Sequence, residues 1–203
     1  MNNKSRTKSI LTHMFTFLKP LIIASLLIGG LQVSGLMSSV SYGSRWALLQ
    51  TGLWDATPAK GIESETFDYG FQIKDLQGTK LSFDQFKNKV VFLNLWATWC
   101  GPCRAEMPGI QKLFDKIDNE KITFIMLSLD KDSDLGKVSD YMKKNKFTFH
   151  AYMPSGYLPS QLQVPTIPTT FIISKDGKII QKEIGSMQYD TSKFQQFLED
   201  LSK

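Results

Sequence analysis

The chain has 203 residues, of which 42% are hydrophobic, 12% aromatic and 21% charged. These proportions are typical of a globular protein and exclude a disordered chain, a collagen and a disulfide-rich mini-protein. The net charge is +5, but residues 1–44 contain four of the 24 basic residues and none of the 19 acidic ones. The rest of the chain is therefore close to neutral and gives no sign of a nucleic-acid-binding face.

The basic tail, residues 1–20, is followed by an uncharged segment over residues 21–43, for which two interpretations stand. As a transmembrane anchor, this segment is about 34 Å long at 1.5 Å per residue, enough to cross a hydrocarbon core of about 30 Å. As a cleaved signal peptide, its strongly apolar part, Leu21–Leu31, has the length of a hydrophobic region, and Ser39 or Ser41 precedes the cut.

We favour the anchor, because aromatic residues just beyond it resemble an interfacial belt: Tyr42, Trp46 and Trp54. The alternative for the two tryptophans is that they pack on the domain. Under both interpretations the positive charges keep the tail in the cytoplasm. The rest of the chain is then exported, first a tether over residues 44–66 without clear periodicity and then a domain over residues 67–203.

The domain shows a regular order of elements. Apolar and polar residues alternate over 71–76, and Gly78 precedes Leu81, which predicts a β-hairpin. The remaining pattern predicts strands at 90–96, 122–129, 147–152, 169–173 and 178–184, helices at about 100–117 and 134–146, a loop at 156–163, and a last helix capped by Asp190 or Thr191. This order predicts an α/β fold, a central mixed sheet with helices on both faces.

Two cysteines are present, Cys100 and Cys103, at the predicted start of the first helix. A zinc site needs four ligands, and the other soft candidates are His13 and His150, so we predict no metal site and no cofactor but a redox pair. In a first helical turn the two Cβ atoms are about 5–6 Å apart, close enough for a disulfide. The helix N-terminus stabilises a thiolate, so Cys100 is the expected nucleophile and Cys103 the resolving cysteine.

The residues around this motif, Phe92-Leu93-Asn94-Leu95-Trp96-Ala97-Thr98-Trp99-Cys100-Gly101-Pro102-Cys103-Arg104-Ala105-Glu106-Met107-Pro108, resemble the active-site region of membrane-tethered thioredoxin-like proteins of the TlpA/ResA type. Residues 164–173 resemble the second signature of that family. The resemblance implies a thioredoxin fold with an N-terminal hairpin and a central helix–strand insertion, and the 65 residues from Cys103 to Pro168 leave room for the insertion.

The resemblance also assigns supporting residues to the site. Trp99, Gly101 and Pro102 surround the cysteines, and the residue matching Pro168 is a cis-proline facing them. That proline exposes the backbone of Ile167 to an extended substrate segment, in the manner of strand addition.

The chain departs from thioredoxin at Asn94, where thioredoxin has a buried acid. Proton handling for Cys103 then falls to Glu106, to Asp130 or to water. Each acid has a simpler interpretation. Glu106 would be an acid near the positive N-terminal end of the helix dipole, which it stabilises, and Asp130 would be a solvated loop residue.

The resemblance implies an exported thiol–disulfide oxidoreductase of the bacterial inner membrane, with its domain in the periplasm or extracytoplasmic space. Its implied substrates are disulfides in apocytochromes c or other exported proteins, and a membrane electron donor of the DsbD or CcdA type would re-reduce it. The Gly-Pro dipeptide matches thioredoxin, at about −270 mV, and not strong oxidants, at about −120 mV. The alternatives are a thiol oxidase or isomerase and a copper metallochaperone, for which Met107 is weak support; a peroxidase motif is not matched.

Overall fold

The computed structural model describes residues 65–117 and 120–203, together with single residues and short stretches between 19 and 56. The chain divides into two units, residues 1–40 and residues 41–203. Among the residues that are described, no helix has both the length and the apolar character needed to cross a membrane. Most of the predicted anchor or signal peptide, residues 21–43, lies outside the described residues, so both interpretations of it stay predictions.

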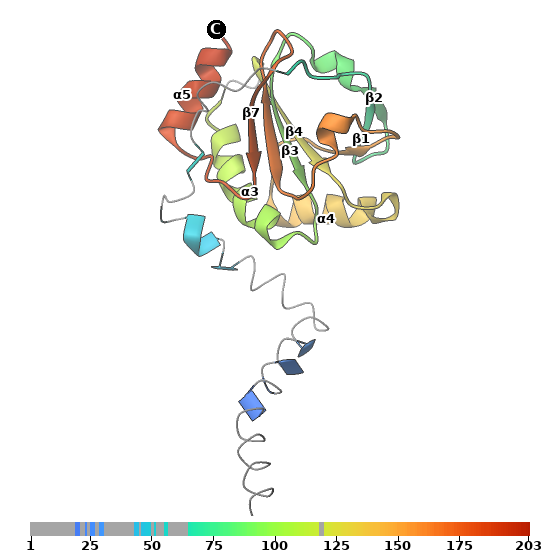
Figure 1. The fold of residues 1–203 in the computed structure, drawn as a ribbon. Helices are drawn as coiled ribbons and strands as arrows, with labels where there is room; N and C mark the ends of the chain where they lie inside the picture. Colours follow the sequence, from blue (N-terminus) through green and yellow to red (C-terminus); the bar gives the residue numbers. More distant parts are fainter. Residues whose placement is uncertain are drawn as a thin grey trace, which may run out of the picture. The chain divides into compact units, whose positions relative to one another are not determined.

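The second unit is built on one mixed sheet of seven strands in the order β2-β1-β5-β4-β3-β6-β7 (Figure 1). The strands are β1 (Gln72–Asp75), β2 (Lys80–Ser82), β3 (Val90–Trp96), β4 (Ile122–Ser128), β5 (Ala151–Pro154), β6 (Thr169–Ile173) and β7 (Ile179–Ile184). β3, β4 and β5 run parallel, and the other neighbouring pairs are antiparallel. Every residue of the central strand β3 is buried, as expected of a strand covered on both faces.

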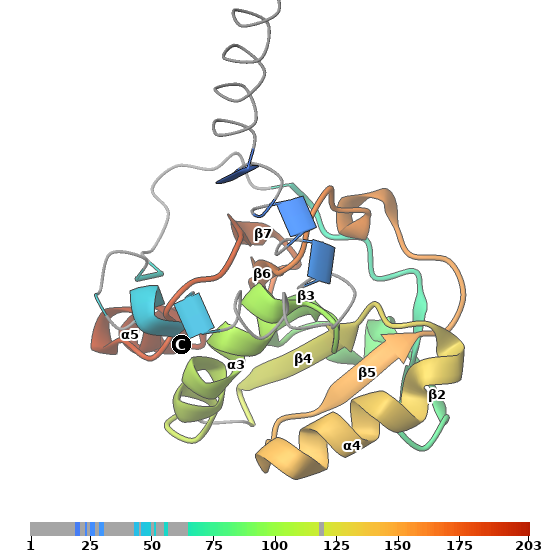
Figure 2. The same ribbon diagram turned by 90° about the horizontal axis from the view of Figure 1, so that it is seen from below.

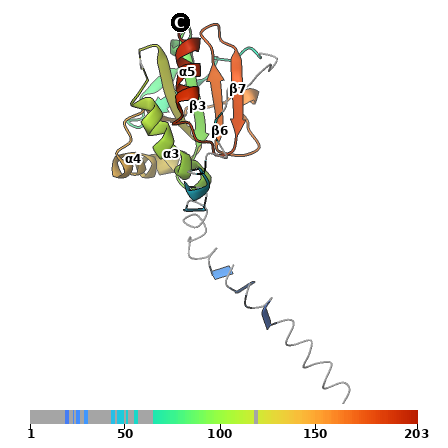
Figure 3. The same cartoon turned by 90° about the vertical axis from the view of Figure 1, so that its left-hand side faces the viewer.

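Three α-helices cover one face of this sheet: α3 (Gly101–Phe114), α4 (Leu135–Asn145) and α5 (Ser192–Leu201). Buried residues of all three belong to one hydrophobic cluster, and Figures 2 and 3 show the helices on the same side of the strands. A second, aromatic-rich cluster fills the opposite face under residues 67–71 and the short 3-10 helices η1 (Phe83–Phe86) and η3 (Ser160–Leu162). A further 3-10 helix, η2 (Asp132–Asp134), precedes α4.

The thioredoxin-like α/β fold with a mixed sheet is confirmed, but in the described part of the domain all three α-helices lie on one face and the other face carries only short 3-10 helices. The reason lies in the topology. β3, β4 and β5 follow one another in one direction across the sheet. Right-handed crossovers between them therefore place both connecting helices, α3 and α4, on the same face.

Two predicted ends of elements also differ from those in the structure. α3 ends at Phe114, because the chain then tightens into a turn in which Lys116 N–H bonds to Leu113 O at 3.0 Å. The strand predicted at 147–152 begins only at Ala151. Ahead of it, Lys146 ends α4 in the left-handed conformation at φ 57°, and residues 147–150 stay outside the sheet.

The strand directions bring the two sequence signatures together. β3 ends at Trp96, just before the cysteines, and pairs antiparallel with β6, so that Leu95 lies opposite Thr169. The loop that ends at Pro168 therefore lies at the same end of the sheet as Cys100. The predicted hairpin is present as well, with Ile73 opposite Leu81.

Candidate active site

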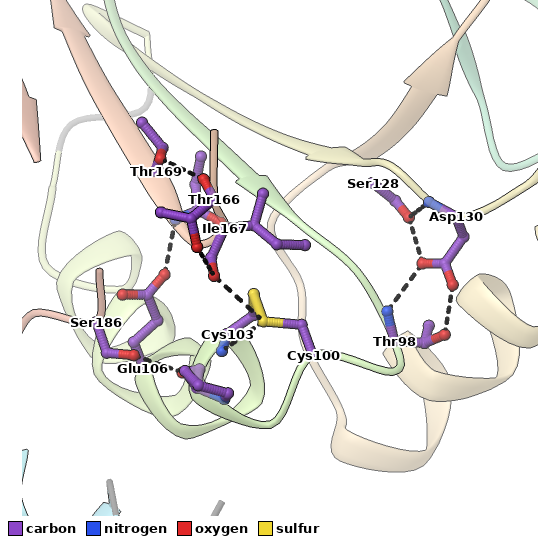
Figure 4. Close-up of a disulfide and its surroundings, with 12 residues drawn as sticks. Thr98, Cys100, Cys103, Glu106, Ser128, Asp130, Thr166, Ile167, Thr169 and Ser186 are labelled. Atoms are coloured by element: carbon purple, nitrogen blue, oxygen red, sulfur yellow. Dashed lines mark hydrogen bonds between the residues drawn. A yellow bond between two sulfur atoms is a disulfide. The ribbon is translucent and has the colours of Figure 1, made fainter. Parts of the chain in front are cut away.

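Cys100 and Cys103 form a disulfide at the start of α3, with their Cα atoms 5.3 Å apart (Figure 4). Cys100 is the N-cap residue of the helix, and its sulfur accepts the backbone N–H of Cys103 at 3.1 Å. Gly101 and Pro102 fill the first helical positions, where proline loses no helical hydrogen bond. The pair therefore closes within one helical turn while its outer sulfur stays next to a helix amide.

The residues of the motif differ in their exposure to solvent. Trp99 is 63% exposed, whereas Cys100 is 5% exposed and Cys103 is fully buried. The Ile167–Pro168 bond is cis, as the family resemblance implies, and the Ile167 carbonyl oxygen lies 3.8 Å from the Cys100 sulfur. Cys100 thus lies between an exposed neighbour in the chain, Trp99, and the carbonyl of Ile167.

Glu106 lies one turn along α3 from Cys103, on the same side of the helix. Its carboxyl is 1% exposed; Oε1 accepts Asn94 Nδ2 at 2.8 Å, and Oε2 accepts the Met187 N–H at 3.1 Å. Burial raises the pKa of Glu106 from 4.5 to about 8, although both hydrogen bonds act in the opposite direction. An acid at the surface of a first helical turn would be solvated, so simple matching of the helix dipole does not describe this residue.

Asn94 joins this carboxyl to the neighbouring strand, because its amide also donates to Thr170 Oγ1 at 2.9 Å. The sequence marks Asn94 only as the loss of thioredoxin's acid, whereas here it is the donor that holds another acid. Thr170 lies within the second signature, whereas Met187 carries no local motif. Their participation depends on chain segments that meet only in the fold.

Asp130 lies on the opposite side of the cysteines from Glu106 (Figure 4). It is 7% exposed, so the interpretation as a solvated loop acid is wrong. Its carboxylate accepts the Thr98 N–H at 2.8 Å and the hydroxyls of Thr98 and Ser128 at 2.6 Å each. Asp130 thus fastens the turn before Trp99 to the end of β4.

The part of the chain that the structure describes contains no group of three or more His, Cys, Asp and Glu side chains arranged to hold a metal ion. The site contains a cysteine pair that can form and open a disulfide, a helix amide directed at the Cys100 sulfur, and a buried acid, Glu106, one helical turn from Cys103. A disulfide at a helix N-terminus, beside a cis-proline on a mixed sheet, defines a thioredoxin-like redox site.

Comparison with known proteins gives the family. Residues 63–198, more than half of the chain, match the Redoxin family, and the chain belongs to it. It is 36% identical over 116 residues to a thiol-disulfide oxidoreductase ResA of Bacillus cereus, an alignment that covers 57% of this chain and 66% of that protein. The chain therefore spans slightly less than two thirds of the length of this relative.

Two further similarities are to proteins of the same type. The sporulation thiol-disulfide oxidoreductase A of Bacillus subtilis is 30% identical over 119 residues, which cover 58% of this chain and 72% of that protein. The crystal structure of StoA from Bacillus subtilis has a TM-score of 0.51 and 27% identity, covering 66% of this chain and 96% of that one.

Proposed function

We propose that this protein is an exported thiol–disulfide oxidoreductase that reduces disulfides of other exported proteins through Cys100 and Cys103. The observation that carries the proposal is the position of Cys100 at the N-cap of α3, where its sulfur accepts the Cys103 N–H. In the reduced protein, this donor and the positive end of the helix stabilise a thiolate on Cys100. Membership in the Redoxin family and the names of the similar proteins support the type of reaction.

The reaction has two exchange steps. The Cys100 thiolate attacks one sulfur of a substrate disulfide, so that a mixed disulfide forms and the other substrate sulfur leaves as a thiolate. The Cys103 thiolate then attacks the Cys100 sulfur, which releases the second substrate thiolate and closes the Cys100–Cys103 disulfide. Two electrons pass to the substrate, whose thiolates take up two protons, and the protein ends in its oxidised form.

Glu106 is the proposed partner for the proton of Cys103. The second step requires Cys103 to be deprotonated in a fully buried position. A carboxyl group with a pKa of about 8 is close in proton affinity to a thiol, and proton exchange between groups of matched affinity costs little. Asp130 is a weaker proposal for this role, because its carboxylate accepts three hydrogen bonds that hold the turn before Trp99, whereas the carboxyl of Glu106 accepts two.

The cellular setting is proposed from the family resemblance and the charge pattern. The substrates are disulfides of apocytochromes c before haem attachment, or of another exported protein, and the electron donor is a membrane protein of the DsbD or CcdA type. Residues 21–43 hold the chain in the bacterial inner membrane, with the domain on the extracytoplasmic side.

Replacing each cysteine by serine tests the assignment of roles. Cys103→Ser leaves the nucleophile without a resolving partner, so mixed disulfides are expected to accumulate in cells and to appear as high-mass bands on a non-reducing gel. Cys100→Ser is the matched control and is expected to form none. Bands that depend on Cys103 instead of Cys100 would contradict the order of attack, and mass spectrometry of the trapped partners identifies the substrates.

The direction of electron flow is tested by equilibration with a thiol–disulfide buffer. Because Gly101–Pro102 matches the thioredoxin dipeptide, the reduction potential is expected nearer to about −270 mV than to about −120 mV. A value near the oxidising end would favour the thiol oxidase. Stoichiometric binding of Cu(I) by the reduced chain, without disulfide reduction, would favour the metallochaperone.

A further inference from the structure

An arm of the chain, of which the structure describes residues 46–49, 51, 55 and 56, is attached to the domain at Asp55 and Ala56, although it precedes the residues matched to the Redoxin family. The backbone N–H of Ala56 donates to Gln188 O at 2.9 Å, and Asp55 forms a parallel β-bridge with the same residue. Ala56 is 1% exposed and belongs to the hydrophobic cluster that contains Cys100 and Cys103. The end of the arm, Ala56, is therefore part of the same hydrophobic core as the two cysteines.

Residues 185–188, to which the arm is bonded, form a loop between β7 and α5. This loop makes hydrogen bonds to three residues of the site. Its hydrogen bonds run from Gly185 N–H to Pro168 O at 2.9 Å, from Ser186 Oγ to Pro102 O at 2.8 Å, and from Met187 N–H to Glu106 Oε2 at 3.1 Å. One short loop thus holds the cis-proline loop, the dipeptide between the cysteines and the buried acid.

Gln188 is the junction between the arm and this loop. Its carbonyl oxygen is bonded to Ala56, and its side chain lies against α3 at Gly109. A Cβ atom at position 109 would be only 2.9 Å from Gln188 Oε1, so a larger residue there would displace the Gln188 amide from α3. The loop is therefore held between α3 on one side and the arm on the other.

We propose that the arm is a positioning element of the redox site, which by pairing with Gln188 holds the 185–188 loop in place against Glu106 and Pro102. This inference rests on the proposed function of the two cysteines. A loop without the arm has one fewer backbone bond and loses the packing of Ala56, and local opening of such segments is set by contacts of this kind. The Met187 N–H would then leave Glu106 for part of the time.

The consequence concerns the ionisation of Glu106. Burial is the largest cause of its raised pKa, and the Met187 bond acts weakly in the opposite direction. A loop that opens admits water to the carboxyl, so the relief of burial decides the sign and Glu106 becomes easier to ionise. Tyr189 faces the same carboxyl, since the Glu106 charge adds to burial in raising the pKa of Tyr189. This phenol stays neutral across the pH range in which Glu106 titrates and does not obscure the effect.

Two alanines of the arm supply a matched pair of variants in the full chain. Ala56→Arg places a long charged side chain at a buried position and displaces the end of the arm, whereas Ala47→Arg makes the same change at an exposed position. For each reduced protein, the rate of Cys100 alkylation is measured against pH, and the hydrogen exchange of the Met187 amide is followed by mass spectrometry or NMR.

In Ala56→Arg the Met187 amide is expected to exchange about tenfold faster, and the inflection of the alkylation profile that reports Glu106 is expected to fall by about half a pH unit, a change of about threefold in proton affinity. Ala47→Arg is expected to match the parent chain. An unchanged or raised inflection, or an unchanged Met187 exchange, would overturn the inference. A parent chain that reduces no disulfide would instead overturn the proposed function, so the two failures are distinct.

A second variant covers the case in which Ala56→Arg does not fold. Ala56→Pro removes the N–H that is donated to Gln188, and the preceding residue, Asp55, already lies in an extended bridge, as a residue before proline prefers. The same faster exchange and lowered inflection are expected. A folded Ala56→Pro protein that matches the parent in both measurements overturns the inference as well.

Discussion

At the scale of single residues, Glu106 links the chemistry of the site to the stability of the fold. Its pKa is about 8 in the folded protein because of burial, against an ordinary value of 4.5 in an unfolded chain. The folded state therefore binds a proton that the unfolded state has released between these two values. The contribution of Glu106 to stability is fully present below pH 4.5 and is lost as the pH rises through about 8.

This linkage predicts the effect of Glu106→Gln. In the oxidised parent chain, the free energy of unfolding is expected to fall between about pH 5 and 8 by up to about 1.4 kcal/mol per pH unit, and Glu106→Gln is expected to remove this slope. Urea denaturation at a series of pH values measures it. Glu199→Gln on α5 is the control and should keep the parental slope, and a parent chain with no such slope would show that Glu106 is ionised throughout.

The sequence identifies Glu106 but not its surroundings. An acid three residues after Cys103 is visible in the motif, whereas its burial depends on Met187, which is 81 residues away in the chain. Asn94 is also visible in the sequence, but only as a position at which the buried acid of thioredoxin is absent. Its donation to Glu106 becomes evident only when β3 and α3 are packed together.

At the scale of elements, the turn between β3 and α3 is fixed by a residue of another strand connection. Asp130 follows β4 and accepts three hydrogen bonds from Thr98 and Ser128. Two of these bonds hold Thr98, two residues before Cys100. The position of the nucleophile thus depends on the register between β3 and β4, in which Trp96 lies opposite Ser128.

Asp130→Asn is therefore predicted to act on stability and not on proton transfer. The amide group has one acceptor oxygen in place of two and turns an N–H toward a donor, so the free energy of unfolding is expected to fall by about 1–3 kcal/mol. The pH midpoint of Cys100 alkylation is expected to stay at the parental value. Asp140→Asn, at an exposed position of α4, is the control; a shifted midpoint in Asp130→Asn would instead give Asp130 a part in proton handling.

Sequence patterns predict elements best where burial is uniform. β3 and β6 are found at their predicted bounds because continuous apolar runs leave little choice of strand ends. The start of β5 is predicted too early because Phe147 and Phe149 are apolar but stack their rings, with centroids 5.1 Å apart, ahead of the strand. The face on which each helix lies follows from the strand order, which no local pattern contains.

At the scale of the whole molecule, the distribution of charge predicts the topology. The basic residues of the tail precede an uncharged segment, and the remaining chain is nearly neutral. Positive charges next to a hydrophobic segment are generally retained in the cytoplasm, so we expect the segment to insert with its C-terminal end outside. The domain would then work in a compartment in which disulfides persist, and a reductant there must be re-reduced through the membrane.

Protease accessibility tests this topology. If the domain is exported, external protease digests it in spheroplasts of cells that express the full chain, and in intact inverted vesicles the domain is protected. A cytoplasmic protein without an export segment serves as the control for membrane integrity. A domain protected in spheroplasts would refute export. A shortened domain released from the membrane fraction would identify residues 21–43 as a signal peptide, whereas a full-length chain extracted only by detergent would identify them as the anchor that we favour.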